Sequence, residues 1–257
     1  KQKLSVLVLD EQPEAGGQIY RSVSSTKHLR PETYSLLGPD YQVGQTLEHS
    51  FQQSGVDYIP GASVWQVEPD LSVLYLRNGD VEQVGARRLL VATGAMERPV
   101  PIPGWTLPGV MGAAAADVLL KSSGNVPSGR VVLAGSGSLL WLTASRLAAA
   151  DVKILAVLET TTLLNYLQAL PHLPRALFAS EYLLKGLRLK QQVRRAGIPV
   201  HSGIHELNAT GNKRLETVCY THQGQSRKLA LETLLLHEGV VSNNQLTRQL
   251  NCEHIWH

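Results

Sequence analysis

The chain has 257 residues, and its 43% hydrophobic and 18% charged residues exclude a disordered or low-complexity protein. A net charge of +3 and 5% aromatic residues do not indicate a nucleic-acid-binding protein. Two cysteines are too few for a disulfide framework and are typical of a reducing compartment. No signal peptide is visible, and no apolar run is uninterrupted enough to span a membrane, so we expect a cytoplasmic protein.

The first hundred residues predict a strand and a helix followed by a β-meander. The run 3–10 (KLSVLVLD) is apolar and ends in an acid, which is typical of a buried parallel strand. Asn78–Gly79 indicates a tight hairpin turn between two of the later strands. The other predicted elements are a loop at 11–17, a helix at 46–54, and strands at 56–59, 63–68, 72–77, 81–86 and 88–92, the last of them buried.

The second part of the chain alternates strands and helices. Four prolines and a glycine at 99–108 predict an extended connector, and we place a domain boundary there. Gly197 predicts the end of an amphipathic helix, with Leu183, Leu184, Leu187 and Val193 on one side. The predicted helices lie at 112–121, 138–150 and 180–195, and the strands at 130–134, 152–159, 215–221 and 229–236, with a further strand near Val200.

A dinucleotide-binding pattern follows the strand at 130–134. Gly135 and Gly137 stand between this strand and a helix, where glycines let the backbone approach a pyrophosphate. Glu159 ends the next strand, 24 residues after Gly135, as an acid for a ribose would. Leu140 takes the third glycine position, which leaves two interpretations: an NAD site, or a Rossmann-shaped module with a poor or empty site. Glu159 would repel a 2′-phosphate and so favours NAD over NADP.

The chain also contains an internal repeat. The strand that ends at Asp10 resembles the strand that ends at Glu159, which predicts two Rossmann-like modules. The counterpart of 130–150 is not in this sequence, so we expect the first module to lack its first strand and glycine loop. Asp10 is followed by Gly16–Gly17, a spacing typical of flavin-binding Rossmann domains, and Ala92-Thr93-Gly94 is the second landmark of such proteins.

Four segments carry a family resemblance: VLVLDEQPEAGGQIYR (6–21), LLVATGAMERPVPIPGWTLPGVMGA (89–113), VVLAGSGSLLWL (131–142) and LLLHEGVVSNNQL (234–246). The chain resembles the α (A) subunits of opine oxidases, hydrogen cyanide synthase and dye-linked proline dehydrogenases. The resemblance implies a flavoprotein of the pyridine-nucleotide-disulfide-oxidoreductase type, in which an NAD-like domain is inserted into an FAD domain. It also implies a second subunit, related to D-amino-acid oxidases, that oxidises the amine.

These observations predict an α/β protein with two Rossmann-like modules, the second inserted into an incomplete first. We expect the FAD-binding domain at 1–103, the NAD-like domain at 104–233 and a truncated return to the FAD domain at 234–257. We expect FAD as the cofactor, with its site incomplete in this chain, and NAD as a candidate at the second site. The candidate contacts are Asp10, Glu11, Gly16, Gly17, Gln18, Ala92, Thr93 and Gly94 for FAD, and Gly135, Gly137 and Glu159 for NAD.

The favoured function is that of the flavin and electron-transfer subunit of a heteromeric amino-acid or opine dehydrogenase or oxidase, with a small amine, amino acid or opine as substrate. Two alternatives stay open: a catalytically silent subunit that scaffolds a partner oxidase, and a self-contained NAD-dependent reductase. No side chain is assigned as a catalytic acid or base.

Other motifs indicate structure rather than chemistry. No C-x-x-C is present, and Cys219 is expected to be a buried small hydrophobe in a strand. His201 and His205 lie in a strand or loop and do not share a helical face, so no metal site is expected. One helix is basic, which indicates either a solvated face or a surface that docks a partner. Its cations are Lys185, Arg188, Lys190, Arg194 and Arg195.

Overall fold

The computed structural model describes residues 4–255, and the chain divides into two compact units. Unit 1 comprises Lys1–Met96 and Val241–His257, and unit 2 comprises Glu97–Val240. The chain therefore forms most of unit 1, then all of unit 2, and then returns. The sequence places the corresponding boundaries after residues 103 and 233. Strands β6 (Ala95–Glu97) and β15 (Val240–Ser242) pair with each other where the chain crosses between the units.

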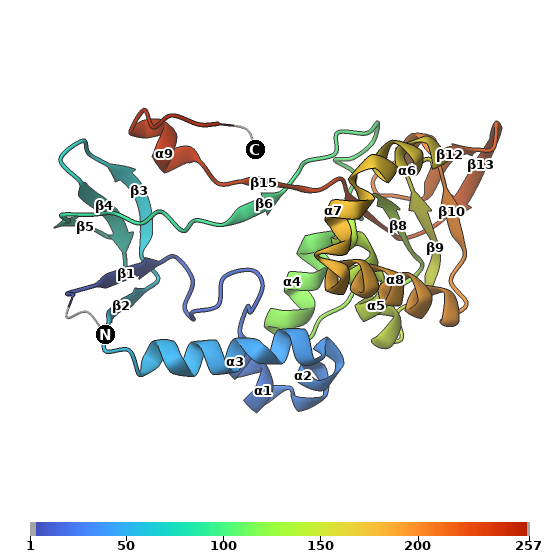
Figure 1. Cartoon of the computed structure of the whole chain (residues 1–257). Helices are drawn as coiled ribbons and strands as arrows, with labels where there is room; N and C mark the ends of the chain where they lie inside the picture. The colour runs from blue at the N-terminus through green and yellow to red at the C-terminus, as the bar shows by residue number, and fades with distance from the viewer. Residues whose placement is uncertain (1–3, 256–257) are drawn as a thin grey trace. The chain divides into compact units, whose positions relative to one another are not determined.

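Unit 1 combines a parallel strand pair, helices and an antiparallel meander (Figure 1). Strands β1 and β2 run parallel, and the predicted hairpin between β4 and β5 is confirmed. Its turn residues Asn78 and Gly79 both have positive φ, as a two-residue hairpin requires. The elements are β1 (Leu7–Asp10), α1 (Val23–Leu29), α2 (Pro31–Leu37), α3 (Pro39–Gln52), β2 (Asp57–Pro60), β3 (Ser63–Val67), β4 (Ser72–Arg77), β5 (Asp80–Gly85) and α9 (Gln245–Gln249).

Two sequence-based predictions for unit 1 are wrong. Strand β1 is shorter than predicted and not buried, since Leu7 is 38% exposed; position 3 lies outside the described residues. The segment 88–92 forms no strand, and Leu90 is 90% exposed. A parallel strand becomes buried only between neighbouring strands and covering helices. Among the described residues β1 pairs with β2 alone, and 88–92 pairs with no strand.

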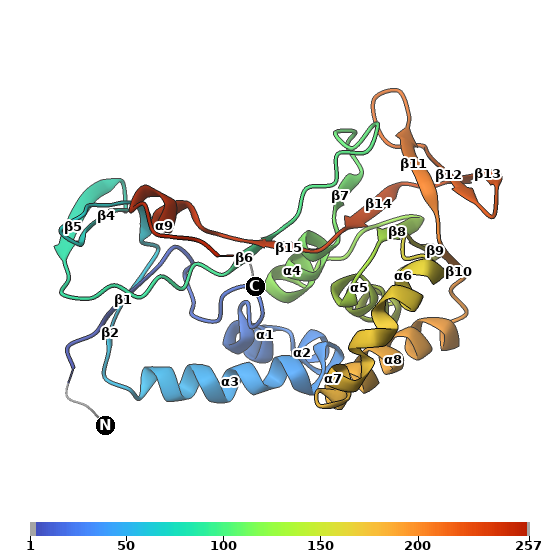
Figure 2. The same cartoon turned by 45° about the horizontal axis from the view of Figure 1, so that its top comes forward.

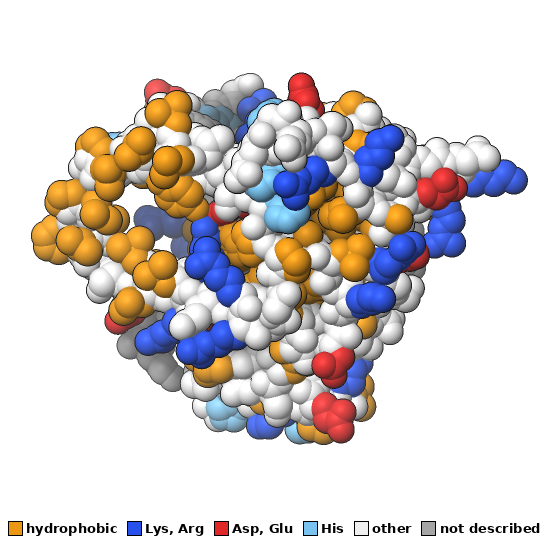
Figure 3. Space-filling model, turned by 90° about the vertical axis from the view of Figure 1, so that its right-hand side faces the viewer, with side chains coloured by type: hydrophobic (Ala, Val, Ile, Leu, Met, Phe, Trp, Pro, Cys, Tyr) orange, Lys and Arg blue, Asp and Glu red, His pale blue; other side chains and the backbone are white. Residues whose placement is uncertain are grey.

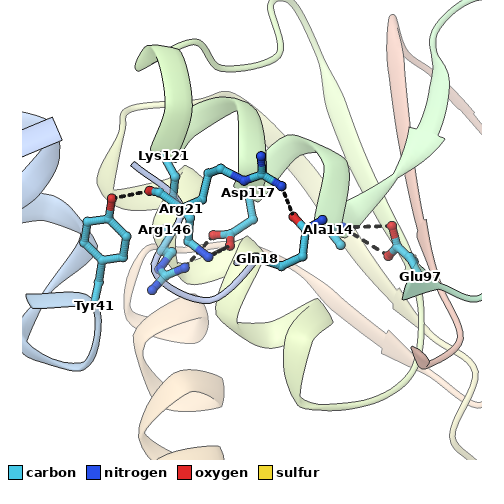
Figure 4. Close-up of polar contacts among 8 residues, drawn as sticks. All are labelled: Gln18, Arg21, Tyr41, Glu97, Ala114, Asp117, Lys121 and Arg146. Carbon is cyan, nitrogen blue, oxygen red and sulfur yellow. Dashed lines mark hydrogen bonds and ion pairs between the residues drawn. The ribbon is translucent and has the colours of Figure 1, made fainter. Parts of the chain in front are cut away.

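The loop that follows β1 is fixed onto helix α3. The ring of Tyr20 lies so close to Gly44 that a Cβ on Gly44 would stand 2.4 Å from its Cδ1 atom. The hydroxyl of the buried Tyr41 donates to the backbone carbonyl of Arg21 at 2.6 Å, as Figure 4 shows. Helix α3 therefore presents a glycine and a tyrosine that hold the end of this loop in place.

Unit 2 contains a five-stranded parallel sheet in the order β10-β9-β8-β14-β7 (Figure 2). The run VVLAG of β8 is buried along its whole length, because it is covered on both faces. Its alternate residues Val131 and Leu133 face one hydrophobic cluster, and Val132 and Ala134 face the other. The strands are β7 (Val110–Gly112), β8 (Val131–Gly135), β9 (Ile154–Glu159), β10 (Val200–Ser202) and β14 (Thr233–His237).

Helices cover one face of this sheet. Helices α4 (Ala113–Ser123), α5 (Ser138–Ala149) and α8 (Ser180–Arg195) contribute to the first cluster, close to the predicted ranges. A buried ion network joins α4 to α5: Asp117 accepts from Lys121 at 2.7 Å and from Arg146 at 2.6 Å (Figure 4). Three shorter helical elements precede α8, namely α6 (Leu163–Ala169), η1 (Leu170–His172) and α7 (Leu173–Leu177).

A three-stranded antiparallel sheet covers the other face. It consists of β11 (His205–Thr210), β12 (Thr217–His222) and β13 (Gln225–Ala230). The prediction of one strand at 229–236 is wrong, because β13 ends and β14 begins within it. Glu232 forms the corner between them, where its carboxylate accepts from the backbone and guanidinium of Arg130. Cys219 in β12 is half-buried, and neither cysteine forms a disulfide.

The buried face of α8 also differs from the prediction. Leu189 and Val193 are its buried residues, whereas Leu184 and Leu187 are 51% and 64% exposed. The sequence pattern alone does not say which apolar stripe of a leucine-rich helix meets the sheet, because tertiary contacts make that choice.

Candidate dinucleotide sites

The glycine turn of unit 2 connects β8 to α5 at the carboxyl edge of the sheet. A Cβ on Gly135 would lie 1.8 Å from the carbonyl oxygen of His237, and the Ser136 N–H donates to that oxygen at 2.8 Å. Glycine is therefore required at 135 because the end of β14 passes against the turn. Gly137 has a φ of 95° and caps α5 without a side-chain hydrogen bond.

Leu140 takes the position of a third glycine and lies in helix α5. Its side chain is fully buried in the cluster between α5 and the sheet, together with Leu133 and Val157. The helix is therefore spaced from the sheet by a leucine side chain, and this position contributes core packing.

Glu159 stands at the end of β9, in register with Gly135, and only 3% of it is exposed. Its Oε1 accepts from Lys190 Nζ at 2.8 Å and from the Tyr166 hydroxyl at 3.0 Å. Its Oε2 accepts from the Ser202 hydroxyl at 2.7 Å. Both oxygens of this carboxylate thus have partners supplied by α6, α8 and β10.

Lys190 joins Glu159 to two aromatic rings. Its Nζ lies 4.7 Å from the centroid of the Trp141 ring and 2.7 Å from the Tyr166 hydroxyl. Burial lowers the pKa of Lys190, but the hydrogen bonds to Glu159 and Tyr166 outweigh it, so that the pKa lies above its usual value. Lys190 is therefore a cation in the folded protein at neutral pH.

A second carboxylate, Glu238, lies at the same edge. Its Oε2 accepts from Ser136 Oγ in the glycine turn at 2.7 Å, and its Oε1 accepts from Thr160 Oγ1 at 2.8 Å. The sequence patterns did not single out this residue. The available signal was an acid directly after the buried strand β14, the same feature that singled out Asp10 and Glu159.

His237 and Glu97 form a buried pair beside this turn. His237 is 2% exposed, and its Nδ1 donates to Glu97 Oε1 at 2.6 Å. The Glu97 carboxylate also accepts from the Ala114 N–H at the start of α4, as Figure 4 shows. The pair therefore connects β14 to the first turn of α4.

In unit 1, Asp10 ends strand β1 and is half-buried. Its Oδ1 accepts from the Gln12 N–H at 2.9 Å, while its Oδ2 has a long contact of 3.4 Å with the Tyr58 hydroxyl. Burial, together with the charge and hydrogen bond of Asp10, raises the pKa of Tyr58 to about 12. One carboxylate oxygen of Asp10 therefore keeps capacity for a further hydrogen bond.

The predicted residues after Asp10 lie in one ordered loop. The Tyr20 N–H donates to the Gly16 carbonyl at 3.0 Å, and a Cβ on Gly16 would meet the Tyr20 carbonyl oxygen at 2.5 Å. The Gln18 side chain accepts from the Arg21 guanidinium at 3.0 Å (Figure 4). Glu11 accepts from the side chain of Gln12 at 3.0 Å.

The segment at 92–94 is joined to the returning chain. The Asn243 N–H donates to the Gly94 carbonyl at 3.0 Å, and its side chain donates to the Thr93 carbonyl at 2.9 Å. The Thr93 hydroxyl donates back to the Asn243 carbonyl at 2.7 Å. Ala92 is exposed, and the space where a Gly94 side chain would stand holds no atom within 4 Å. Asn243 positions this backbone; it lies in the segment 234–246 that carries the family resemblance, but it was not among the predicted contacts.

The other predicted motifs do not converge on a site. His201 Nδ1 lies 2.8 Å from the Tyr220 hydroxyl, whereas His205 Nδ1 lies 3.2 Å from the Gly203 carbonyl. Burial, with the nearby charges of His222 and Arg227, lowers the pKa of His201. Within residues 4–255, no cluster of three His, Cys, Asp or Glu side chains is arranged for a metal ion.

Many large apolar side chains of residues 163–187 are exposed. This segment contains α6, α7 and the first part of α8, and we call its exposed face the α6–α8 surface. Figure 3 shows hydrophobic side chains gathered beside Lys and Arg on this side of the molecule. Residues 160–196 contain six Lys or Arg and one acid, Glu181. No helix in the described part of the chain is long and apolar enough to cross a membrane. The most exposed members of the surface are Leu163, Leu164, Leu177, Phe178, Tyr182 and Leu187.

Comparison with known proteins places these features in a family. The family model described as pyridine nucleotide-disulphide oxidoreductase matches residues 3–257. The opine oxidase A subunit of Rhizobium meliloti is 42% identical over 98% of this chain and 48% of its own length. Its counterpart in Agrobacterium tumefaciens strain Ach5 is 41% identical over 98% of the chain and 50% of its own length. The chain thus spans about half the length of these relatives.

The solved structures support the same fold. L-proline dehydrogenase of P. horikoshii superposes with a TM-score of 0.60 at 15% identity, over 98% of this chain and 40% of that one. The expected α/β fold of Rossmann type is therefore confirmed, and so is the resemblance to opine oxidase A subunits. The chain belongs to the pyridine nucleotide-disulphide oxidoreductase family, a family of flavin-dependent oxidoreductases.

Proposed function

We propose that the protein carrying this chain is an FAD-dependent oxidoreductase that serves as the flavin and electron-transfer subunit of a heteromeric amino-acid or opine dehydrogenase or oxidase. The observation that carries the proposal is the similarity to two opine oxidase A subunits over 98% of the chain. The substrate class is a small amine, amino acid or opine, as the names of these relatives suggest.

Two features of unit 1, at Asp10 and at Gly94, fit an FAD. The free acceptor capacity of Asp10 Oδ2 suits a ribose hydroxyl at the carboxyl end of a parallel strand. The unobstructed backbone at Gly94, held by Thr93 and Asn243, suits a close approach of the cofactor. When bound, the isoalloxazine ring of FAD supplies the two-electron redox chemistry. The chain's own residues bind and orient, and no described side chain is assigned as an acid or base.

A companion subunit is part of the proposal. The relatives are named as subunits, and the α6–α8 surface is larger and more apolar than isolated exposed leucines would explain. Its excess of cations disfavours pairing with a second copy of itself and favours a partner whose apolar face is bordered by carboxylates. We infer that a subunit related to D-amino-acid oxidases docks here and oxidises the amine.

The absorption spectrum of the purified whole protein tests this function. Flavin bands at one equivalent per chain support it, and a colourless protein that still activates its companion subunit favours the alternative of a silent scaffold. NADH-dependent dye reduction by the whole protein without a companion favours the second alternative, an NAD-dependent reductase.

The docking surface has a separate test. Leu167→Asp places a charge on α6, where Leu167 is 52% exposed, and Val81→Asp places one on β5, where Val81 is 63% exposed. Co-purification of the whole protein with its companion subunit is expected to fail for Leu167→Asp and to persist for Val81→Asp. Retention of the companion by both variants would contradict docking at this surface and leave the flavin assignment untouched.

A further inference from the structure

We propose that Glu238 is an internal anion that closes the glycine turn of unit 2, so that this Rossmann module does not hold NAD(H) as its sequence pattern suggests. The inference goes beyond the proposed function, since it concerns unit 2 and does not depend on whether unit 1 binds FAD. Three observations carry it: two concern the glycine turn, and one concerns the acid that would bind a ribose.

The first observation concerns the position of the pyrophosphate. A glycine turn at a helix N-terminus attracts a phosphate through its N–H groups and the positive end of the helix dipole. Here the Glu238 carboxylate is bonded to Ser136 within that turn and to Thr160 at the end of β9. Helix α5 has no acidic residue in its own first turn, and Ser136, which holds Glu238, directly precedes the N-cap residue Gly137. A pyrophosphate would meet this like charge at short range.

The second observation concerns space beside the turn. In a dinucleotide site, the first glycine makes the tight turn, and the second lets the backbone approach the pyrophosphate. At Gly135 the carbonyl oxygen of His237 lies 1.8 Å from the position that a Cβ would take. The glycine therefore accommodates strand β14, and its presence in the sequence is explained without a ligand.

The third observation concerns the ribose. A ribose-binding acid must offer oxygens to two hydroxyls of the ligand. Both oxygens of Glu159 are occupied by Lys190, Tyr166 and Ser202, and the residue is buried. If Glu159 turned toward a ligand, the Lys190 ammonium would lose its paired carboxylate, which costs free energy. Glu159 thus anchors α6 and α8, and NAD does not fit the residues of this module.

Calorimetric titration of the whole protein with NADH, and separately with ADP-ribose, tests the inference. We expect no saturable binding by the unmodified protein at ligand concentrations on the order of 1 mM, which corresponds to a binding free energy weaker than about −4 kcal/mol. Glu238→Ala removes the charge together with the whole polar group, and Glu238→Gln removes the charge but keeps a neutral amide of similar size. At least one of the two is expected to show saturable binding of ADP-ribose, with a dissociation constant about tenfold below 1 mM.

The matched control is Glu216→Gln, which removes the same charge from an exposed position of unit 2 away from the turn. It is expected to bind as the unmodified protein does. Thermal unfolding shows whether each variant is folded, and the conservative Gln variant keeps the test valid if the Ala variant is not. Micromolar binding of NADH by the unmodified protein would overturn the inference, and so would folded Glu238 variants that bind no better than Glu216→Gln.

Discussion

The ammonium of Lys190 lies 2.8 Å from Oε1 of Glu159, and this ion pair joins the middle of helix α8 to the end of strand β9. The pair is asymmetric, since 27% of the Lys190 side chain is exposed but only 5% of the Glu159 side chain. Removing the lysine therefore leaves a buried carboxylate with two hydroxyl donors and no counter-charge, which is unfavourable.

Lys190→Met is expected to lower the free energy of unfolding by about 1–3 kcal/mol, the cost of leaving a buried polar group without its partner. Arg188→Met is the control, because it changes the same charge two residues earlier, where the side chain is exposed. Urea unfolding followed by circular dichroism measures both. Equal stabilities of the two variants would show that the Lys190–Glu159 pair contributes nothing.

A second prediction concerns Tyr58, whose pKa is raised to about 12 by burial and by Asp10. Because the folded state favours the protonated phenol, this stabilisation is complete below the unfolded pKa of about 10 and is lost as the pH rises toward 12. In Asp10→Asn the phenol loses the neighbouring charge, so its pKa should fall toward 10. Ultraviolet titration, with Tyr58→Phe to identify the signal, measures the change. An unaltered titration in Asp10→Asn would contradict the contact.

Gly44→Ala is expected to destabilise unit 1, although alanine normally favours a helix over glycine. The added Cβ would overlap the ring of Tyr20, and such overpacking costs about 1–3 kcal/mol. The same substitution at Gly186 in α8 meets no atom within 4 Å and should stabilise the protein by about 0.5–1 kcal/mol. Thermal unfolding should therefore show shifts of opposite sign, and a stabilising Gly44→Ala would argue against the close approach.

The Arg130–Glu232 pair predicts acid sensitivity at the corner between β13 and β14. Hydrogen bonds from the Arg130 side chain and backbone lower the pKa of Glu232 to about 2. A lowered carboxyl pKa contributes stability that is present above the unfolded value of about 4.3 and is lost as the pH falls toward 2. Glu232→Gln should therefore show a smaller loss of stability between these pH values than the unmodified protein. Identical acid unfolding profiles would exclude this contribution.

The sequence predicted β8, α5 and α8 of unit 2 well because local patterns determine them. The run at 131–135 is continuously apolar, and α8 ends at Arg195, its predicted boundary, two residues before Gly197. The failures have a different origin. Leu89–Ala92 has the composition of a buried strand, but a strand forms only where a neighbouring strand supplies hydrogen bonds, and none lies beside it among the described residues.

The candidate sites were predictable to a similar degree. Asp10 and Glu159 were singled out because an acid follows an apolar strand, and both stand at strand ends. Their partners come from distant segments: Lys190 lies 31 residues from Glu159, and Tyr58 lies 48 residues from Asp10. Sequence spacing carries no information on such contacts, so it could not show that one oxygen of Asp10 has only a long hydrogen bond, whereas both oxygens of Glu159 have short ones.

The affinity of the whole protein for FAD tests the central claim most directly. Asp10→Ala removes the acid assigned to the ribose, and Asp57→Ala removes an exposed acid at the other end of the β1–β2 pair. Loss of a charge-assisted hydrogen bond, about 1.5–3 kcal/mol, weakens binding roughly 10- to 150-fold. We predict a flavin-bound unmodified protein, a loss of this size measured by flavin fluorescence for Asp10→Ala, and no loss for Asp57→Ala. An unmodified protein that binds no flavin, or an Asp10→Ala variant that binds it as tightly as Asp57→Ala does, would contradict the assignment of unit 1 to FAD.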